Sequence, residues 1–378
     1  MFRRWLFWIH LIAGCLAGAV ILAMSVTGVL LTYERQIVAW AERGAFQATV
    51  PSGGAPLPLE RLLAPHAAIL PGAVLTLRSN PREPAELRAG RESTFYIDRY
   101  SGLLMGEPEH GTAAFFQTVR AWHRWLGVSG NGGGRDTAKA ITGACNLAFL
   151  VLVVSGAYLW VPRQWSAQHL RPILWFREGL SGKARDFSWH NVFGVWSLVP
   201  LFFVVLTAVP ISYTWGTAAI YWLTGTPAPS GPPRRGGPPQ RKAVREPVDL
   251  AGLGALWARA ESQTPGWRSI SAPAAPDPGP VAFTIDTGTG GQPQRRSTLV
   301  LRRESGEVVR HETFGDLDAG RRLRSYARFL HTGEVLGVTG QTIAGLASLG
   351  GAMLVWTGIS LALRRLAAWN RRRTRPAN

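Results

Sequence analysis

The chain has 378 residues, 46% of them hydrophobic, and includes 16 Trp and 15 Phe. Four apolar runs are long enough to cross a hydrocarbon core about 30 Å thick, which takes roughly 20 helical residues, so the composition excludes an ordinary soluble protein. The net charge of +18 is concentrated beside these runs, where it orients a membrane protein, and does not indicate nucleic-acid binding. The sequence therefore predicts an integral membrane protein of mainly α class.

The four predicted spans carry no Asp, Glu, Lys or Arg in their central parts. They cover residues 5–32, 138–161, 189–213 and 338–363. Arginines precede the first span, fill the loop between the second and third, and follow the fourth. Short loops rich in Lys and Arg stay in the cytoplasm, so we expect a multi-pass protein with both termini cytoplasmic and two external segments.

The first external segment, residues 34–110, is too polar for the membrane. Residues 57–70 have helical apolar spacing and end at Pro71-Gly72. Short alternating runs predict strands at 73–77, 86–89 and 94–97. Tyr100-Ser101-Gly102 predicts a turn before a further strand. This order indicates a small α+β domain.

The second external segment opens with a stretch rich in Pro, Gly and Arg, residues 224–247. It cannot bury a core and predicts a disordered basic linker, with a site for an anionic ligand as the alternative. Residues 250–260 then predict a helix. Alternating runs predict strands at 281–285, 298–301 and 308–312. We therefore expect a second small external α+β domain.

The chain contains an internal repeat. A shift of 180 residues places His10 on His190, and a shift of 202 residues places Gly156 on Gly358. Each unit begins in the cytoplasm, so the repeats are parallel and related by an axis along the membrane normal. We predict a four-helix transmembrane bundle built from two parallel repeats.

The expected domain organisation follows from these segments. In chain order it comprises transmembrane helix 1 (1–33), external domain 1 (34–110), a His-bearing amphipathic helix with transmembrane helix 2 (111–163), a cytoplasmic loop (164–187), transmembrane helix 3 (188–223), the basic linker (224–247), external domain 2 (248–315), a second His-bearing helix with transmembrane helix 4 (316–365) and a basic cytoplasmic tail (366–378). The cytoplasmic segments are too short to house a nicotinamide or flavin domain.

Four of the eight histidines occupy repeat-related positions at the membrane boundaries. His10 and His190 share the cytoplasmic side, and His123 and His331 share the external side. Two histidines from facing helices can supply both axial ligands of a b-type haem, so the pattern predicts two haem sites with these four residues as iron ligands. Helix anchoring in the headgroup region is the alternative for one histidine, but symmetric pairs favour ligation.

Small and basic residues accompany the histidines. Five glycines leave room for a flat macrocycle or a neighbouring helix, namely Gly14, Gly28, Gly156, Gly194 and Gly358. Four arginines can pair with haem propionates, and a topogenic role explains them equally well. These arginines are Arg3, Arg4, Arg124 and Arg328.

Residues 95–106, FYIDRYSGLLMG, resemble the strand-turn-strand signature of PepSY domains. The segments around His123 and His331, above all FLHTGEVLG and the following GQTIAGLASLG, resemble the PepSY-associated transmembrane family of bacterial inner-membrane proteins. The resemblance covers nearly the whole chain. One departure is Arg302, which stands where the first signature has Asp98.

The resemblance implies two periplasmic PepSY-like domains and a haem-containing inner-membrane protein of iron acquisition, some family members being ferric-siderophore reductases. We therefore expect a di-haem b electron-transfer protein that reduces a periplasmic ferric siderophore from Fe(III) to Fe(II). Its electron donor is a quinol or a cytoplasmic reductant, and its other partner is membrane lipid.

The alternative is a non-enzymatic, membrane-anchored PepSY binding or regulatory module. A transporter is disfavoured, because the span centres lack charged or broken-helix features. The chain contains no dinucleotide fingerprint, Walker loop, zincin motif or nucleophile elbow. Outer-sphere electron transfer needs none of these, so we expect no catalytic acid, base or nucleophile.

Overall fold

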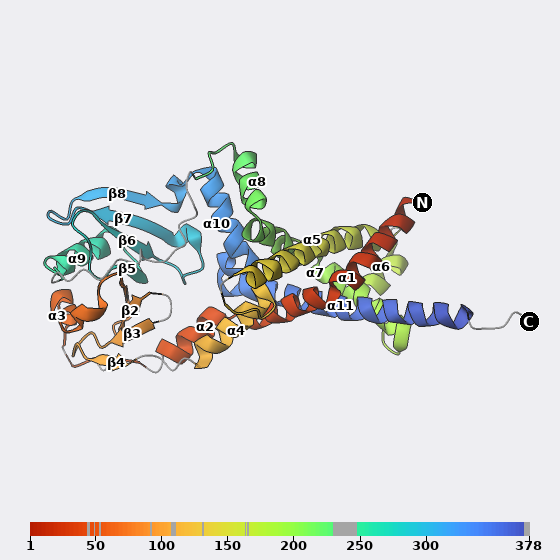
Figure 1. Cartoon of the computed structure of the whole chain (residues 1–378), viewed down its shortest axis with the longest axis horizontal. Coiled ribbons are helices and arrows are strands. Elements are labelled where there is room, and N and C mark those ends of the chain that lie inside the picture. The colour runs from red at the N-terminus through yellow and green to blue at the C-terminus, as the bar shows by residue number, and fades with distance from the viewer. Residues whose placement is uncertain are drawn as a thin grey trace, which may run out of the picture. The chain divides into compact units, whose positions relative to one another are not determined.

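The structure, a computed structural model, describes residues 1–43, 46–48, 50–52, 54–90, 93–106, 111–130, 132–162, 164, 166–229 and 248–373. Most of the predicted basic linker at 224–247 lies outside these residues. The chain divides into two compact units (Figure 1). The helical unit comprises Met1–Glu34, Ala114–Leu223 and Leu323–Asn378, and the sheet unit comprises Arg35–Ala113 and Thr224–Arg322.

Four long apolar helices form the body of the helical unit. They are α1 (Phe2–Leu31), α5 (Gly133–Trp160), α7 (Gly182–Ser212) and α11 (Gly337–Arg373). Each is long and apolar enough to cross a membrane, where a helix satisfies its own backbone hydrogen bonds. The prediction of four spans is confirmed, as expected for a multi-pass membrane protein.

The long helices form a closed ring of neighbours. α1 packs against α5 and α11, and α7 packs against the same two helices, so α1 and α7 lie on a diagonal. Small residues permit this packing, because helices within lipid associate mainly through close contact. A Cβ at Gly351 of α11 would lie only 3.0 Å from Ser25 Oγ and 3.2 Å from Phe149 Cζ. The centre between the helices is filled by Ala17, Ile21, Val153, Leu201, Val205, Ala347 and Val355.

Shorter helices flank the four long ones. They are α2 (Glu34–Val38), the π-helix η1 (Ala39–Arg43), α4 (Gly111–Trp125), α6 (Ala167–Leu174), α8 (Thr214–Thr224), α10 (Ala319–His331) and the 3₁₀ helix η5 (Glu334–Leu336). α4 and α10 are the two predicted His-bearing helices. Each ends within two residues of its histidine.

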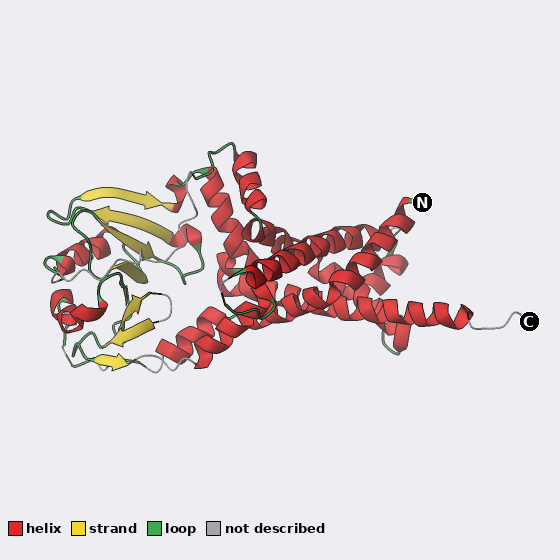
Figure 2. Cartoon of the chain, viewed as in Figure 1, coloured by secondary structure: helices red, strands yellow, loops and turns green. Residues whose placement is uncertain are grey.

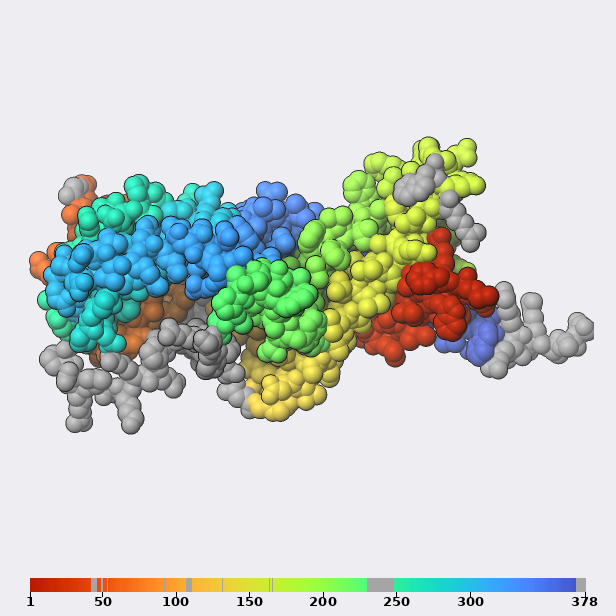
Figure 3. Space-filling view, turned by 90° about the horizontal axis from the view of Figure 1, so that it is seen from above, coloured from red at the N-terminus to blue at the C-terminus, as the bar shows by residue number. Residues whose placement is uncertain are grey.

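The third span and α8 form two helices, although we expected one helical segment over 188–223. Tyr213 adopts an extended conformation (φ −122°, ψ 137°) and separates them. α8 lies at the surface of the helical unit (Figure 3) and exposes Trp215, Trp222 and Leu223. Exposed Trp is typical of a helix at the membrane interface.

The sheet unit holds one eight-stranded antiparallel sheet in the order β4-β3-β2-β1-β5-β6-β7-β8 (Figure 2). The strands are β1 (Val74–Arg78), β2 (Ala85–Ala89), β3 (Ser93–Ile97), β4 (Leu104–Gly106), β5 (Ser269–Pro273), β6 (Val281–Asp286), β7 (Arg296–Leu301) and β8 (Val308–Thr313). Every predicted strand is present, and β5 is additional.

The two external segments share this sheet, whereas we expected two separate domains. β1 of the first segment pairs with β5 of the second over five residues, from Val74 opposite Pro273 to Arg78 opposite Ser269. Without this pairing, β1 and β5 would each present an open edge of unpaired backbone groups, which favours further strand pairing. The join therefore closes both edges and makes one domain from two segments.

One hydrophobic core lies against one face of the sheet. It joins strand residues of both segments to the helices α3 (Leu59–Leu63) and α9 (Leu253–Gln263). The short 3₁₀ helix η2 (Ala64–Ile69) takes the second half of the helix that we expected at 57–70. Glu60 of α3 accepts a hydrogen bond of 2.8 Å from the Gly254 N–H in the first turn of α9, where a negative charge is favourable.

The two strand-turn-strand signatures close differently. In the first, the Asp98 carboxylate accepts two N–H groups of the turn, at 2.7 and 3.2 Å, and Gly102 adopts the left-handed conformation (φ +73°). In the second, Arg302 instead pairs with Glu307 at 3.2 Å, while Gly306 keeps the left-handed conformation (φ +67°). The departure at Arg302 removes the aspartate cap and preserves the turn.

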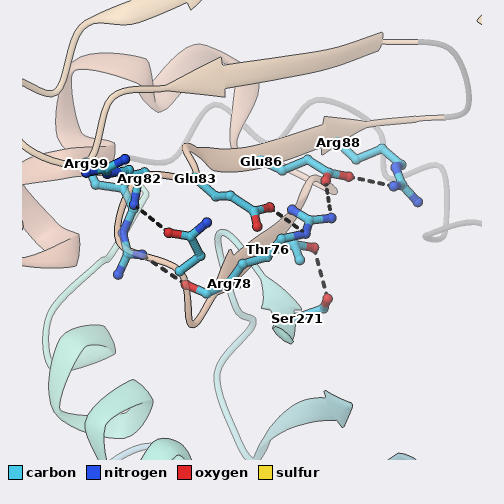
Figure 4. A network of polar contacts seen from close by, with 9 residues as sticks. Thr76, Arg78, Arg82, Glu83, Glu86, Arg88, Arg99 and Ser271 are labelled. Atoms are coloured by element: carbon cyan, nitrogen blue, oxygen red, sulfur yellow. Dashed lines mark hydrogen bonds and ion pairs between the residues drawn. The ribbon is translucent and has the colours of Figure 1, made fainter. Parts of the chain in front are cut away.

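Polar side chains cover part of the sheet face opposite the core (Figure 4). Glu86 is only 4% exposed, and its carboxylate accepts hydrogen bonds from Arg78 at 2.8 Å and Arg88 at 2.6 Å. Burial alone would raise the pKa of Glu86, but the two arginines outweigh burial and leave that pKa below its ordinary value. Thr76 and Ser271 bond across the β1–β5 join at 2.9 Å.

We expect Glu86→Gln to destabilise the sheet unit by about 3 kcal/mol, because it removes one partner of a buried ion pair. The stabilising charge of Glu86 is fully present above its ordinary pKa of 4.5 and is lost as the pH falls through the lower folded value. At pH 7 the Glu86→Gln variant should unfold at a lower temperature than the unaltered protein, and this difference in unfolding temperature should become smaller in acid. Glu307→Gln, in an exposed pair, is the control, with a change below about 1 kcal/mol; a similar loss in both variants would contradict the account.

Candidate functional site

The four predicted ligand histidines meet in two pairs inside the helical unit. His10 of α1 and His190 of α7 face each other from the diagonal helices, with ring centres 6.3 Å apart and planes at 85°. His123 of α4 and His331 of α10 form the second pair, also 6.3 Å apart, with planes at 53°. We call them the His10 pair and the His123 pair.

Each ring of the His10 pair is held by a hydroxyl group of a neighbouring helix. His10 Nδ1 lies 2.8 Å from Ser155 Oγ, and His190 Nδ1 lies 2.9 Å from Thr357 Oγ1. Both hydroxyl groups donate their single proton to the carbonyl four residues earlier, at 2.6 and 2.7 Å. The imidazole must therefore donate, which places the ring proton on Nδ1.

The same tautomer follows for the His123 pair. His123 Nδ1 lies 2.9 Å from Thr27 Oγ1, and that hydroxyl donates to the Ala23 carbonyl at 2.6 Å. His331 Nδ1 donates to the Val204 carbonyl at 2.8 Å, and a carbonyl can only accept. All four rings thus keep an unprotonated Nε2, the form that binds a metal.

Glycines shape the walls of the His10 pair. A Cβ at Gly156 would lie 3.3 Å from His10 Cε1, and a Cβ at Gly358 would lie 3.4 Å from His190 Cε1. The distance at Gly156 is tighter than ordinary van der Waals contact and that at Gly358 is at its lower limit, so the two glycines give the rings room beside the neighbouring helices. The group that lies close to these two glycines is therefore the histidine ring, whereas we expected a macrocycle or a neighbouring helix. A Cβ at Gly14 or at Gly194 would instead meet a leucine side chain at an ordinary contact distance.

Tight turns fix the position of the His123 pair. After α4, Leu126 (φ +54°) and Gly127 (φ +79°) turn the chain sharply. After α10, Gly333 (φ +74°) turns the chain into η5. A helix that stops this abruptly holds its last side chains in one place, and each histidine lies in such a last turn.

Both histidines of the His123 pair are neutral at pH 7. Burial and then the neighbouring His331 lower the pKa of His123 to about 4. Burial also lowers the pKa of His331, although the bond to the Val204 carbonyl opposes this shift. Neutral imidazole is the form that a metal requires. Among the residues that the structure describes, no group donates a hydrogen bond to Nε2 of any of the four.

The spacing within each pair fits a shared metal. Two imidazoles bound to one metal through nitrogen, with bonds of about 2 Å, have ring centres roughly 6 Å apart. The described residues contain no group of three or more His, Cys, Asp or Glu side chains that could hold a metal ion by themselves. Two imidazoles alone leave a metal short of ligands, so the site suits haem, whose macrocycle supplies the others.

An apolar groove adjoins the His10 pair. It has a volume of about 380 Å³, lies between α1 and α5, and is lined in part by Leu6, Val154, Ser155 and Tyr158. Val154 and Tyr158 are exposed on the outside of the bundle, and Ser155 bonds His10. The groove therefore connects the outer surface of the bundle with a residue that holds the site.

The remaining histidines lie elsewhere. His66 contacts the Gly102 carbonyl at 3.0 Å in the sheet unit, and His169 bonds Ser166 at 2.7 Å in α6. His311 lies on β8, opposite Leu299. His110, which precedes His123 by 13 residues in the sequence, lies outside the described residues.

Sequence reasoning missed the partners that hold the rings. Ser155, Thr357 and Thr27 each precede a glycine, so a hydroxyl-glycine dipeptide at repeat-related positions was the available signal. Sequence reasoning also missed the polar contacts that join α7 to α11 near His190. There the buried Asp186 accepts a hydrogen bond of 2.6 Å from Ser360 and pairs with Arg364 at 3.3 Å.

Comparison with known families supports the resemblance that the sequence shows. The family model described as the PepSY-associated TM region matches residues 7–365, nearly the whole chain. The matched region contains all four paired histidines. Among curated proteins, none matches the chain.

Proposed function

Because this chain belongs to the PepSY-associated transmembrane family, we propose that it is an inner-membrane protein that holds two b-type haems and reduces a ferric siderophore at the periplasmic face. The observation that carries the proposal is the presence of two facing imidazole pairs in one helical bundle. In each ring a hydrogen bond engages Nδ1 and leaves Nε2 for iron.

The contacts of the His10 pair support the internal repeat. His10 bonds Ser155, and the residues displaced by 180 and 202 positions, His190 and Thr357, make the same kind of bond. Gly156 and Gly358 approach the same ring atom of their respective histidines. We therefore propose two parallel repeats related by an axis along the membrane normal.

Charge distribution supports a cytoplasmic location for the bundle end that holds the His10 pair. Arg3 and Arg4 begin α1, Lys183 begins α7, and Arg371 lies in the last turn of α11. Lys and Arg concentrate in cytoplasmic loops. Both termini are then cytoplasmic, and the sheet unit is periplasmic as one domain rather than two.

The chain's own part in the reaction is to hold and orient the imidazole rings and to exclude water from the bundle centre. When bound, haem supplies an iron that alternates between Fe(III) and Fe(II). The Nδ1 hydrogen bonds fix the four rings, and such bonds would hold the rings in place for a metal. Between the two pairs, Ile21, Val153 and Leu201 fill the bundle centre and exclude water.

The electron balance is simple. At the cytoplasmic end the protein takes one electron at a time from a soluble reductant or from a quinol, which gives two electrons in total and releases two protons to the cytoplasmic water. The apolar groove beside Ser155 suits a lipid-soluble quinol. At the periplasmic end it gives one electron to the ferric chelate, so that Fe(III) becomes Fe(II). No covalent bond of the chelating molecule is broken, which is why the periplasmic site needs no general acid, base or nucleophile.

Reoxidation of the reduced protein tests the proposal. Protein reduced with dithionite, freed of excess reductant without oxygen, would be mixed with a ferric siderophore and a ferrous-specific trapping ligand. We expect the oxidised visible spectrum to return, with one Fe(II) trapped for each electron lost. A protein that oxygen reoxidises but no ferric chelate does would contradict the proposal and favour a membrane-anchored PepSY binding module.

A further inference from the structure

The helices that carry the His123 pair are strongly basic. Neither α4 nor α10 contains Asp or Glu. Arg124 directly follows His123, and Arg328 lies three residues before His331, about one helical turn away. Guanidinium groups thus accompany both histidines of this pair. Together with Arg120 and Arg135 of the helical unit, Arg124 and Arg328 form a set that we call the arginine rim.

The charges of the arginine rim crowd one another. Arg120, Arg135 and Arg328 lie close enough to Arg124 to repel its positive charge, and Arg120 also pairs with Glu34 at 3.0 Å. Arg124 and Arg135 both lie over the Trp125 ring, with guanidinium carbons 4.7 and 3.5 Å from its centre. An anion at this place would relieve the repulsion between the guanidinium groups.

Membrane targeting does not explain the arginine rim. Lys and Arg are favoured in cytoplasmic loops, yet the rim accompanies the His123 pair, which we assign to the periplasmic end. Helix packing does not require charge there either, since Arg124 and Arg328 are exposed. A binding role explains why several arginines lie on this side. Guanidinium groups match carboxylates in both charge and geometry.

We propose that the arginine rim binds a ferric chelate bearing free carboxylates and selects such anionic chelates over neutral and cationic ones. The inference rests on the proposed function, because it assigns the substrate class of the same site. Arg124 and Arg328 determine the specificity, since each lies beside a histidine of the His123 pair. Salt weakens the attraction, as it does for any exposed charges.

A redox-inert chelate measures this binding without electron transfer. Ga(III) carries the same charge as Fe(III) and is not reduced, so it reports binding alone. Full-length protein in neutral detergent would be dialysed against gallium(III) citrate or, in a separate experiment, against a cationic gallium(III) trihydroxamate. We expect saturable binding of the citrate complex alone. Arg124→Gln and Arg328→Gln should each raise its Kd about fivefold, and ionic strength raised from about 0.01 M to about 0.15 M should raise the Kd further.

The control variant is Arg177→Gln, which removes the same charge from the exposed loop between α6 and α7 and should leave the Kd unchanged. Equal binding of both gallium complexes, binding of neither, or a Kd unchanged in both rim variants would overturn the inference. Loss of haem from the rim variants with an unchanged Kd would also overturn it and assign the arginines to haem propionates. Selective gallium citrate binding by a protein that reduces no ferric chelate would uphold the inference and reject the proposed function.

Discussion

Replacing His331 with alanine is expected to remove one haem and leave the other in place. His331 faces His123 across 6.3 Å, and alanine offers iron no ligand, so the remaining imidazole cannot hold a bis-histidine haem. The His10 pair should not be affected. Thr27, which holds His123, lies 17 residues from His10 along α1, or about 25 Å, and sites that far apart behave independently.

Haem content per chain measures this effect, and we expect it to fall by about half. His190→Ala should produce the complementary loss at the other pair. His169→Ala is the matched control, because His169 lies in α6, where it bonds Ser166, and this variant should keep the full haem content. An unchanged haem count and spectrum in the His331→Ala protein would contradict the assignment of this ligand.

Gly333→Ala is expected to damage the same site through the backbone. Gly333 adopts a left-handed conformation (φ +74°), and a Cβ there would overlap the carbonyl oxygen of Gly340 in α11. Backbone atoms cannot rotate aside as a side chain does, so the turn must open. The strained conformation and the overlap together should cost about 2–4 kcal/mol. His331, two residues earlier, would lose its position.

Thermal unfolding and haem content of the purified variant test this expectation, and both should fall. Gly133→Ala provides the comparison, because Gly133 begins α5 in a helical conformation and a Cβ there meets nothing within 4 Å. That variant should match the unaltered protein within about 1 kcal/mol. A Gly333→Ala protein with normal haem content and unfolding temperature would show that the turn does not fix His331.

The membrane helices and the histidine pairs could be predicted from the sequence for clear physical reasons. An apolar run of this length has few alternatives to a transmembrane helix. An internal repeat also relates sequence to structure, because equivalent residues of the two units occupy equivalent places in the fold. His10 and His190 occupy the same place in their repeats, and the structure brings their rings together. His123 and His331 each precede the second span of their repeat, and the structure also brings their rings together.

The single sheet could not be predicted, because strand β5 gives no clear signal. Ser269–Pro273 reads SISAP, which lacks the bulky β-branched and aromatic residues of typical strands and ends in proline. Pairing between segments almost 200 residues apart also leaves no local pattern. Periodicity shows which face of a strand is buried, but not which strand lies beside it.

The hydrogen-bond partners of the imidazole rings could not be predicted from the sequence either. A serine or threonine in a transmembrane helix normally bonds its own carbonyl four residues back, as Ser155 and Thr357 do. Only the structure shows that their oxygens also accept from His10 and His190. Those contacts place the ring proton on Nδ1 and leave Nε2 available, which supports the proposal that these histidines bind a metal.

The measurement that tests the central claim most directly is the visible spectrum of the detergent-purified protein, oxidised and then dithionite-reduced, with a pyridine haemochrome count. We predict sharp reduced α-bands and about two b-type haems per chain, one for each histidine pair. A colourless protein purified from haem-replete cells would contradict the account, because its paired imidazoles would then serve a purpose other than binding haem iron.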